Sequence, residues 1–184
     1  KKKNIPIGIL INNAGFGLHD KFTKHKSKDI SSMIQVNCTA LTELTRLFLP
    51  EMLSKKNGCI IQVASIGGFQ PVPYHSVYAA TKSYVLNFSM ALARELKGSG
   101  VQIFSLCPGY MPTEFDKVAG SDDSLGTVAG QMTPEIVVEQ TLGKLKSNPL
   151  FFIPGLRNRI MTHLQRITPR KVVIDITAGM MKKD

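Results

Sequence analysis

The sequence predicts an α/β fold, namely a doubly wound parallel sheet with helices on both of its faces. Four short apolar runs, each beside Asn, Gly or Pro, suggest strands at residues 5–11, 59–64, 101–106 and 151–153. Nearly continuous apolar runs of this kind are typical of strands that are covered on both faces. Helical patterns separate them, so each connection has a dozen residues or more, which is what parallel strands require.

The helices expected between these strands show apolar residues at intervals of three and four. Residues 30–53 form one long helix or two joined helices, and residues 78–96 carry a continuous apolar face. Thr133 and Pro134 open a further helix as its cap and its first-turn residue. Residues 110–133 form a long loop with room for a short helix, and loops of that length are usually functional.

Length and composition indicate a single domain that spans residues 1–184. The chain has a mass of 20.2 kDa, with 43% hydrophobic and 20% charged residues, which excludes wholesale disorder. Neither a signal peptide nor the roughly 18 consecutive apolar residues of a membrane-spanning helix is found, so a soluble cytoplasmic protein is expected. The three cysteines and four histidines show no ligand spacing; we expect the histidines on the surface or in loops, and no metal site.

The positive charge lies at the two ends of the chain. Residues 1–56 carry a net +6, residues 57–145 carry −2 and residues 146–184 carry +6. A nucleic-acid-binding protein would place a basic stripe with interleaved aromatic residues on its functional surface, so the mildly acidic middle argues against that class. Residues 157–184 form a basic amphipathic helical tail. We expect it to pack against the protein, and an anionic membrane surface is the alternative.

A candidate catalytic group lies at the carboxyl ends of the predicted strands. Tyr78 and Lys82 are four residues apart, so both project from one face of a helix. An ammonium beside a phenol favours the phenolate and lowers the phenol pKa, which makes Tyr78 a general acid or base. Ser65 follows the second strand and can donate a hydrogen bond to a substrate oxygen. Asn37 lies within the preceding helix.

These residues resemble the short-chain dehydrogenase/reductase family, whose fold is Rossmann-like. The pieces that carry the resemblance are, in order, Asn12-Asn13-Ala14-Gly15, Asn37 after Val36, Ser65, Tyr78-Ala79-Ala80-Thr81-Lys82, and Pro108-Gly109 with Thr113. Their order and spacing agree with the family's common, shorter-subunit form over about residues 1–155. The resemblance implies an NAD(P)-dependent oxidoreductase that reduces a carbonyl or oxidises a secondary alcohol.

The resemblance also assigns roles to individual residues. It implies that Asn37, Ser65, Tyr78 and Lys82 are catalytic, with Lys82 holding the nicotinamide ribose and Asn37 supporting a water beside it. It implies that the cofactor is bound by Asn13, Ala14, Gly15, Tyr78, Lys82, Pro108, Gly109, Met111 and Thr113. What is common in the family favours NADP(H) over NAD(H) as the cofactor. It also implies a homodimer or homotetramer that pairs through the helices that hold Asn37 and Tyr78. The segment 66–74 and the loop 110–133 hint at a lipid-like or aromatic substrate.

One part of the family pattern is not found in this sequence. The glycine-rich turn that holds the pyrophosphate precedes the Asn-Asn-Ala-Gly turn in the family, and Gly15-Phe16-Gly17 lacks the third glycine that opens a helix. The chain therefore resembles the carboxyl-terminal two thirds of such an enzyme, with the amino-terminal strands missing. We expect this piece alone to expose an apolar sheet face, to bind dinucleotide weakly and to be inactive.

Two other functions stay open at this point. The first is a non-catalytic binding or scaffold protein that keeps the fold and has lost cofactor binding. The second is an isomerase or dehydratase built on the same site, because a fold and its site residues do not determine the overall reaction.

Overall fold

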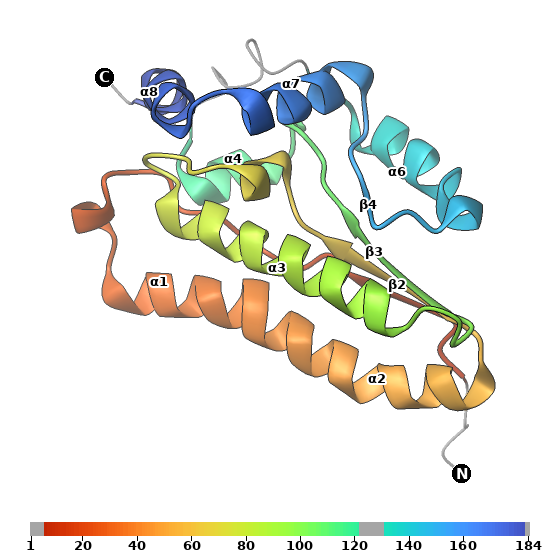
Figure 1. Ribbon diagram of the computed structural model, residues 1–184. Coiled ribbons are helices and arrows are strands. Elements are labelled where there is room, and N and C mark those ends of the chain that lie inside the picture. Colours follow the sequence, from red (N-terminus) through yellow and green to blue (C-terminus); the bar gives the residue numbers. More distant parts are fainter. Residues whose placement is uncertain (1–5, 122–130, 183–184) are drawn as a thin grey trace.

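Four parallel strands form the sheet, in the order in which they occur along the chain (Figure 1). The computed structural model describes residues 6–121 and 131–182. Strand β1 (Ile9–Asn12) pairs with β2 (Gly58–Val63), β2 pairs with β3 (Val101–Leu106), and β3 pairs with β4 (Phe151–Phe152). All three pairings are parallel, and helices connect the strands, so the predicted α/β fold class is confirmed.

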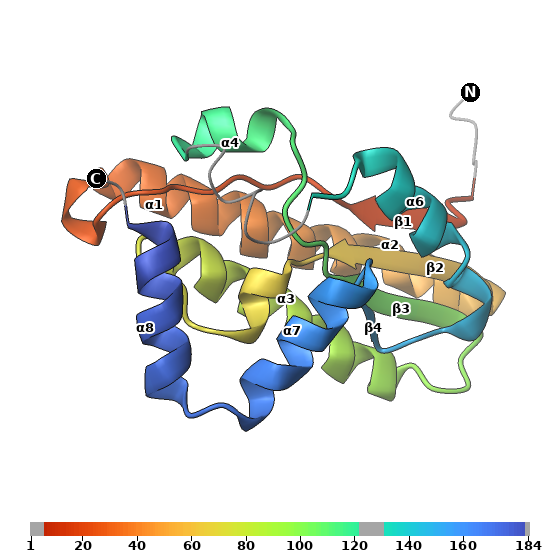
Figure 2. The same cartoon turned by 90° about the horizontal axis from the view of Figure 1, so that it is seen from above.

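Helices pack against both faces of this sheet, as Figures 1 and 2 show. On one face, Ile60 and Ile103 bury their side chains with Met52 of α2 (Leu41–Lys55), and α3 (Ser76–Glu95) lies beside it. On the other face, Phe104 packs with Val137 of α6 (Pro134–Leu142). Successive strand residues thus enter different cores, which is why the strands are apolar almost throughout.

The remaining elements are shorter or lie around the edge of the sheet. They are the helices α1 (Ser27–Ile34), α4 (Glu114–Ala119), α7 (Leu156–Ile167) and α8 (Arg170–Met181), the π-helical segment Gln35–Ala40, and the 3₁₀ turns Phe22–Lys24, Ile66–Phe69 and Leu145–Ser147. The predicted loop at 110–133 therefore contains a short helix, α4, and its residues 122–130 lie outside the described part of the chain. Pro169 separates the two helices of the basic tail, because proline and the residue before it disfavour helical continuation.

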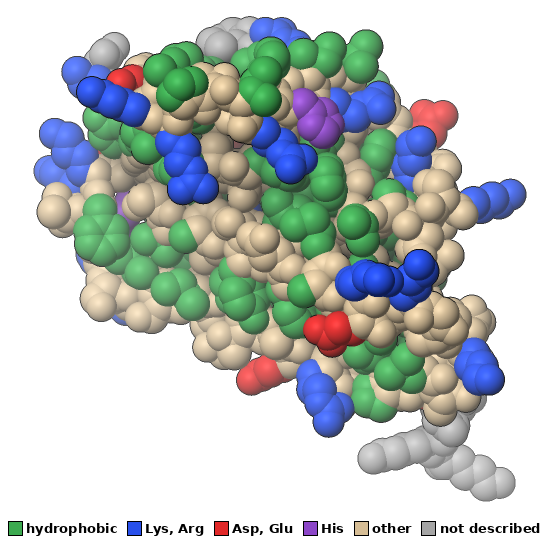
Figure 3. All heavy atoms as spheres, in the orientation of Figure 1, with side chains coloured by type: hydrophobic (Ala, Val, Ile, Leu, Met, Phe, Trp, Pro, Cys, Tyr) green, Lys and Arg blue, Asp and Glu red, His purple; other side chains and the backbone are tan. Residues whose placement is uncertain are grey.

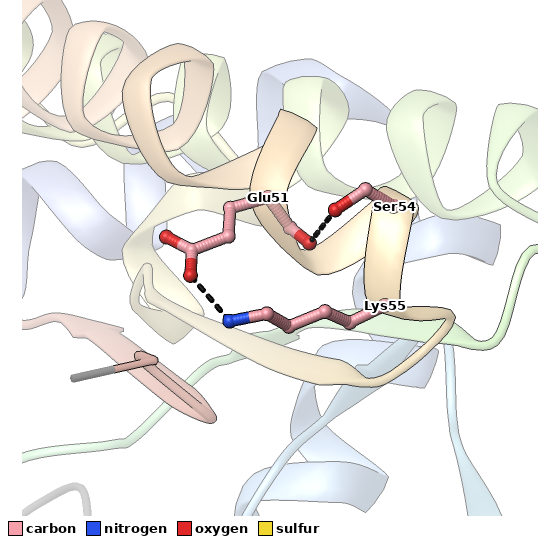
Figure 4. A network of polar contacts seen from close by, with 3 residues as sticks. All are labelled: Glu51, Ser54 and Lys55. Atoms are coloured by element: carbon pink, nitrogen blue, oxygen red, sulfur yellow. Dashed lines mark hydrogen bonds and ion pairs between the residues drawn. The ribbon is translucent and has the colours of Figure 1, made fainter. Parts of the chain in front are cut away.

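The long helix predicted at residues 30–53 is one continuous helical segment with a π-helical middle. Its last turn is closed by an ion pair between Glu51 and Lys55 and by a hydrogen bond from the Ser54 hydroxyl to the Glu51 carbonyl, 2.8 Å long (Figure 4). Lys56 then adopts a left-handed conformation with φ of 50°, which ends the helix before β2. Exposed pairs of this kind contribute little to stability.

A buried polar network ties the carboxyl ends of β1 and β2 to α2. The Asn12 amide donates to Gln62 Oε1 at 2.8 Å and to Thr45 Oγ1 at 3.2 Å. The Gln62 amide also donates to Thr45 Oγ1, which itself donates to the Leu41 carbonyl, both at 2.8 Å. All three side chains are buried, so each depends on the others for its hydrogen bonds. Asn12, the first residue of the Asn-Asn-Ala-Gly turn, is thus a structural residue.

Two histidines form a buried stack that contacts the end of helix α8. The rings of His19 and His75 lie parallel, with centroids 4.5 Å apart, and both side chains are more than nine-tenths buried. His19 Nε2 donates to the Met181 carbonyl at 2.8 Å, at the end of α8. Both residues lie in loops, which is one of the two placements expected for the histidines, but they are buried and the end of the tail contacts His19.

Burial has a clear electrostatic effect on this stack. It lowers the pKa of His75 from 6.5 to about 3, with smaller contributions from His19 and His25. The folded protein therefore holds the His75 imidazole in its neutral form. Between pH 3 and 6.5 the unfolded chain binds a proton at this position that the folded chain does not.

We expect Thr45→Val to lower the free energy of unfolding by about 1–3 kcal/mol, since it keeps the side-chain shape, leaves the Gln62 amide without its acceptor and removes one acceptor of the Asn12 amide. Thr42→Val is the matched control, because Thr42 lies one turn away on α2 and its hydroxyl is partly exposed. Urea unfolding at neutral pH measures both. Equal losses in the two variants would show that the network does not stabilise the fold.

We expect the stability of the wild-type chain to fall as the pH drops below 6.5, by about 1.4 kcal/mol per pH unit from His75 alone. The loss is present only below the ordinary histidine pKa, because above it both states are neutral. His75→Gln should remove this component, so that its unfolding free energy depends less on pH between 7.5 and 5. His163→Gln, at an exposed position of α7, is the control and should follow the wild type. Parallel profiles for all three would contradict the assignment.

Candidate active site

The candidate site lies where the carboxyl ends of the parallel strands meet. Backbone hydrogen bonds hold the segments that leave the strands side by side: Ala64 N to the Leu106 carbonyl at 2.8 Å, and Ile66 N to the Pro108 carbonyl at 3.0 Å. The carboxyl-terminal end of the sheet is therefore formed by the turn after β1, Ser65 after β2 and Pro108 after β3. Ligands of open parallel sheets bind at this edge.

The π-helical segment places Asn37 against the turn after β1. Its side chain pairs with the backbone of Phe16 in both directions, accepting from Phe16 N at 3.1 Å and donating to the Phe16 carbonyl at 2.9 Å. The same amide donates to Thr81 Oγ1 of α3 at 3.0 Å. Asn37 is thus buried between two elements of the site. The helical periodicity of the sequence did not indicate the π-helical turn, and such turns occur often at functional sites.

Helix α3 presents Tyr78 and Lys82 one turn apart, as their spacing predicts. Lys82 Nζ donates to the Val63 carbonyl at the end of β2, at 2.8 Å, and lies 5.7 Å from the centre of the Tyr78 ring. Lys82 is only 5% exposed, and burial lowers its pKa to about 8. The ammonium is held by a strand-end carbonyl on one side and faces an aromatic ring on the other.

Ser65 performs two local tasks at once. Its hydroxyl accepts from Gly67 N at 3.1 Å, which caps the 3₁₀ turn Ile66–Phe69, and its interaction with the Tyr78 side chain lowers the pKa of that phenol. Gly68 allows this turn to lie directly on α3, because a Cβ there would come within 2.8 Å of the Lys82 backbone. Gly68 is therefore required for the close approach of this turn to the helix that carries Tyr78 and Lys82.

The environment of Tyr78 differs from what the sequence suggested. The pKa of Tyr78 is raised to about 12, mainly by burial; Ser65 lowers it and the Asp116 carboxylate raises it, both by smaller amounts. The expectation that Lys82 depresses this pKa is wrong for the protein in this state. Lys82 lies over the ring and donates to Val63, so its charge does not offset the loss of solvent around the phenol.

The segment after β3 closes over Tyr78. The Phe115 ring of α4 lies 5.3 Å from the Tyr78 ring, and Thr113 caps α4 by accepting from Phe115 N at 3.3 Å. Met111 packs on the core cluster around Phe104 instead of facing Tyr78. The sequence did not single out Phe115, since an aromatic residue in a long loop carries no periodic signal.

The other residues expected to bind a cofactor lie around the same edge. Asn13 and Ala14 are exposed and Gly15 is half-buried in the turn after β1, while Pro108 is buried and Gly109 lies against Asn158 of α7. The structure therefore brings Asn37, Ser65, Tyr78 and Lys82 into one cluster and places the expected cofactor residues on its rim.

The surroundings of Gly15 and Lys82 indicate whether the residues around the cluster can hold a dinucleotide. A Cβ at Gly15 would lie 3.1 Å from Asn37 Oδ1 and 3.3 Å from Lys82 Nζ, so a side chain at this position would crowd the amide and the ammonium. An ammonium has three N–H donors, and in the described residues one of them is taken by the Val63 carbonyl. The remaining donors suit the hydroxyl groups of a ribose, so the residues present fit the group.

Comparison with known proteins agrees with this geometry. The model of the family described as short chain dehydrogenase matches residues 1–124. The ketoacyl reductase HetN of Nostoc sp. is 35% identical over 142 residues, which are 77% of this chain and 49% of that protein. The very-long-chain 3-oxoacyl-CoA reductase-B of Danio rerio is 36% identical over 118 residues, 62% of this chain and 38% of that one. The chain thus spans about half, or less, of these relatives' length.

Solved structures extend the match to nearly the whole chain. A short-chain dehydrogenase from Sphingobium yanoikuyae in complex with NADPH superposes with a TM-score of 0.77 at 31% identity, over 90% of this chain and 65% of that one. A 7β-hydroxysteroid dehydrogenase superposes with a TM-score of 0.83 over 96% of this chain and 69% of that one, and its 22% identity supports the fold alone. Since the family model covers two thirds of the residues and the strand order and motif positions agree with it, the chain belongs to the short chain dehydrogenase family.

Proposed function

We propose that this chain carries the catalytic centre of a nicotinamide-dependent oxidoreductase that reduces a carbonyl group or oxidises a secondary alcohol. The observation that supports it most is the convergence of Ser65, Tyr78, Lys82 and Asn37, which come from three separate elements and meet at the ligand-binding edge of the sheet. A protein that only bound a partner would have no use for a phenol placed beside a hydroxyl and a buried ammonium.

In the reductive direction, Tyr78 donates its phenol proton to the carbonyl oxygen of the substrate. A phenol with its pKa raised to about 12 is protonated at neutral pH, so the proton that the reductive direction needs is present. Ser65 donates a hydrogen bond to the same oxygen, where negative charge develops. When bound, a nicotinamide dinucleotide supplies or accepts the hydride.

Lys82 and Asn37 prepare Tyr78 for this step. The Lys82 ammonium stabilises the phenolate that remains after proton donation, since the two side chains face one another on α3. Asn37 holds the turn after β1 at a constant distance from α3 through its bonds to Phe16 and Thr81. We assign Lys82 as the residue that holds the ribose, with Asn13, Ala14, Gly15, Pro108, Gly109 and Thr113 around the dinucleotide.

NADP(H) is the cofactor that we favour over NAD(H). Two neighbours at 31% identity are a short-chain dehydrogenase in complex with NADPH and a serine dehydrogenase complexed with NADP+. For the substrate we favour a carbonyl compound with a lipid-like portion, because several relatives are named ketoacyl or very-long-chain 3-oxoacyl-CoA reductases. The Phe115 ring beside Tyr78 offers an apolar contact for such a chain.

Residues 1–184 form a single domain in this proposal, and it pairs with a second copy through α2 and α3. Two exposed apolar side chains on that side, Leu44 and Leu47 of α2, suit such a contact.

We expect Tyr78→Phe to lower the rate of NADPH-dependent reduction of a 3-oxoacyl thioester by about 10²–10⁴-fold, because it removes the proton donor and keeps the ring. The protein expressed from its complete gene is the material, with NADH as a parallel cofactor. Tyr84→Phe is the matched control on the same helix, since Tyr84 is exposed and bonds only Thr42 in the described residues. Circular dichroism confirms that both variants fold.

The alternatives give different results in this assay. An isomerase or dehydratase would show substrate turnover without net oxidation of NADPH. A scaffold protein would show equal, background rates for the wild type and Tyr78→Phe, and that result would overturn the proposed function.

A further inference from the structure

Helix α7 buries two small polar side chains against the protein, whereas its large apolar side chains face solvent. Asn158 and Thr162 are the buried residues of the helix, at 4% and 2% exposure, and they bond to the Pro154 and Asn158 carbonyls. Ile160 and Ile167 lie on the opposite side, with 50% and 81% of their surface exposed. An amphipathic helix that packs only on its own domain would show the reverse orientation.

Helix α8 continues this arrangement after the break at Pro169. It buries Val173 and Thr177 against the body, whereas Val172 and Ile176 face outwards. We define the outer apolar face by the exposed apolar residues that the two helices share: Leu156, Ile160, Leu164, Ile167, Val172 and Ile176. Figure 2 shows α7 and α8 together on the near side of the molecule, and Figure 3 shows hydrophobic and basic side chains mixed along this upper edge.

Basic residues surround this face. Residues 156–182 contain six Lys or Arg and one acidic residue, Asp175. At 100° per residue, Arg159 and Arg166 border the apolar stripe of α7 on one side and Arg157 borders it on the other. The face therefore combines apolar residues at its centre with cations at its margin.

The two helices are held firmly on the protein, so the face has a defined orientation. Thr177 Oγ1 donates to the Pro71 carbonyl at 3.5 Å, and the Met181 carbonyl accepts from the buried His19 ring. Asn158 lies directly against Gly109, which follows β3. Exposed apolar residues on a fixed surface are a sign of an interaction site.

We propose that the outer apolar face docks the protein on the surface of an anionic phospholipid bilayer. Leu156, Ile160, Leu164 and Ile167 enter the boundary between headgroups and acyl chains, while the arginines around them contact the lipid phosphates. The charge selects this occupant over a second copy of the chain, because two copies would bring five net positive charges on each side together. The attachment is peripheral: none of the described helices is long and apolar enough to cross a bilayer.

The absence of tryptophan from the chain allows a direct test that keeps the face apolar. In Ile167→Trp the single indole reports its surroundings, and we expect a blue shift of its emission, with quenching by brominated acyl chains, when vesicles containing 30% phosphatidylserine are added to the 184-residue protein. Val138→Trp places the indole at an exposed site on α6 and is the matched control, with no shift expected. An unshifted and unquenched Ile167→Trp would overturn the proposal.

Vesicle flotation separates the apolar contribution from the electrostatic one. We expect Ile160→Ser with Leu164→Ser and Ile167→Ser to reduce binding to the level of pure phosphatidylcholine vesicles, and Arg159→Gln and Arg166→Gln to weaken it about fivefold each. These positions face solvent, so the fold is kept, which circular dichroism verifies. Binding that is unchanged by the triple substitution, or equal on neutral and anionic vesicles, contradicts the proposal. So does loss of a solution dimer in the triple variant without any vesicle binding, since that identifies a protein interface.

Discussion

The buried ammonium of Lys82 is the constraint on which the rest of the site depends. A charge at 5% exposure is costly unless it is hydrogen-bonded, and here the Val63 carbonyl at the end of β2 accepts from it. That bond ties α3 to the last residue of β2. Tyr78 is then placed one turn before Lys82, and Ser65 two residues after Val63. The lysine thus determines the relative position of the other two groups.

Buried hydrogen bonds between elements also fix the other segments at the carboxyl ends of the strands. Asn12, Thr45 and Gln62 join β1, β2 and α2, and Asn37 joins the turn after β1 to α3. Each of these side chains is buried and satisfied by another element, so none of the elements shifts without breaking a bond. Burying so many polar groups costs desolvation free energy. In return, the carboxyl ends of the strands are held in one arrangement, which a reaction site requires.

The two helices of the tail pack on the protein with one side and expose the other side to the surroundings. Its inner side is polar and small, with Asn158, Thr162 and Thr177 satisfied by backbone carbonyls. Its outer side is apolar and bordered by cations. Because α8 also covers the stacked His19 and His75 rings, and His75 lies 5.7 Å from the Tyr78 ring, the tail and the candidate site share one packed unit.

The sequence by itself predicted the four strands, the helices between them and the candidate site residues. Apolar runs and helical periodicity are local properties, and the spacing of Tyr78 and Lys82 places both on one helix face wherever that helix packs. The tertiary structure alone decided the pKa directions at Tyr78 and Lys82, the π-helical turn at Asn37, the burial of His19 and His75, and the outward orientation of α7. Each of these depends on which groups from distant parts of the chain replace water around a side chain, and that is a property of the packed fold.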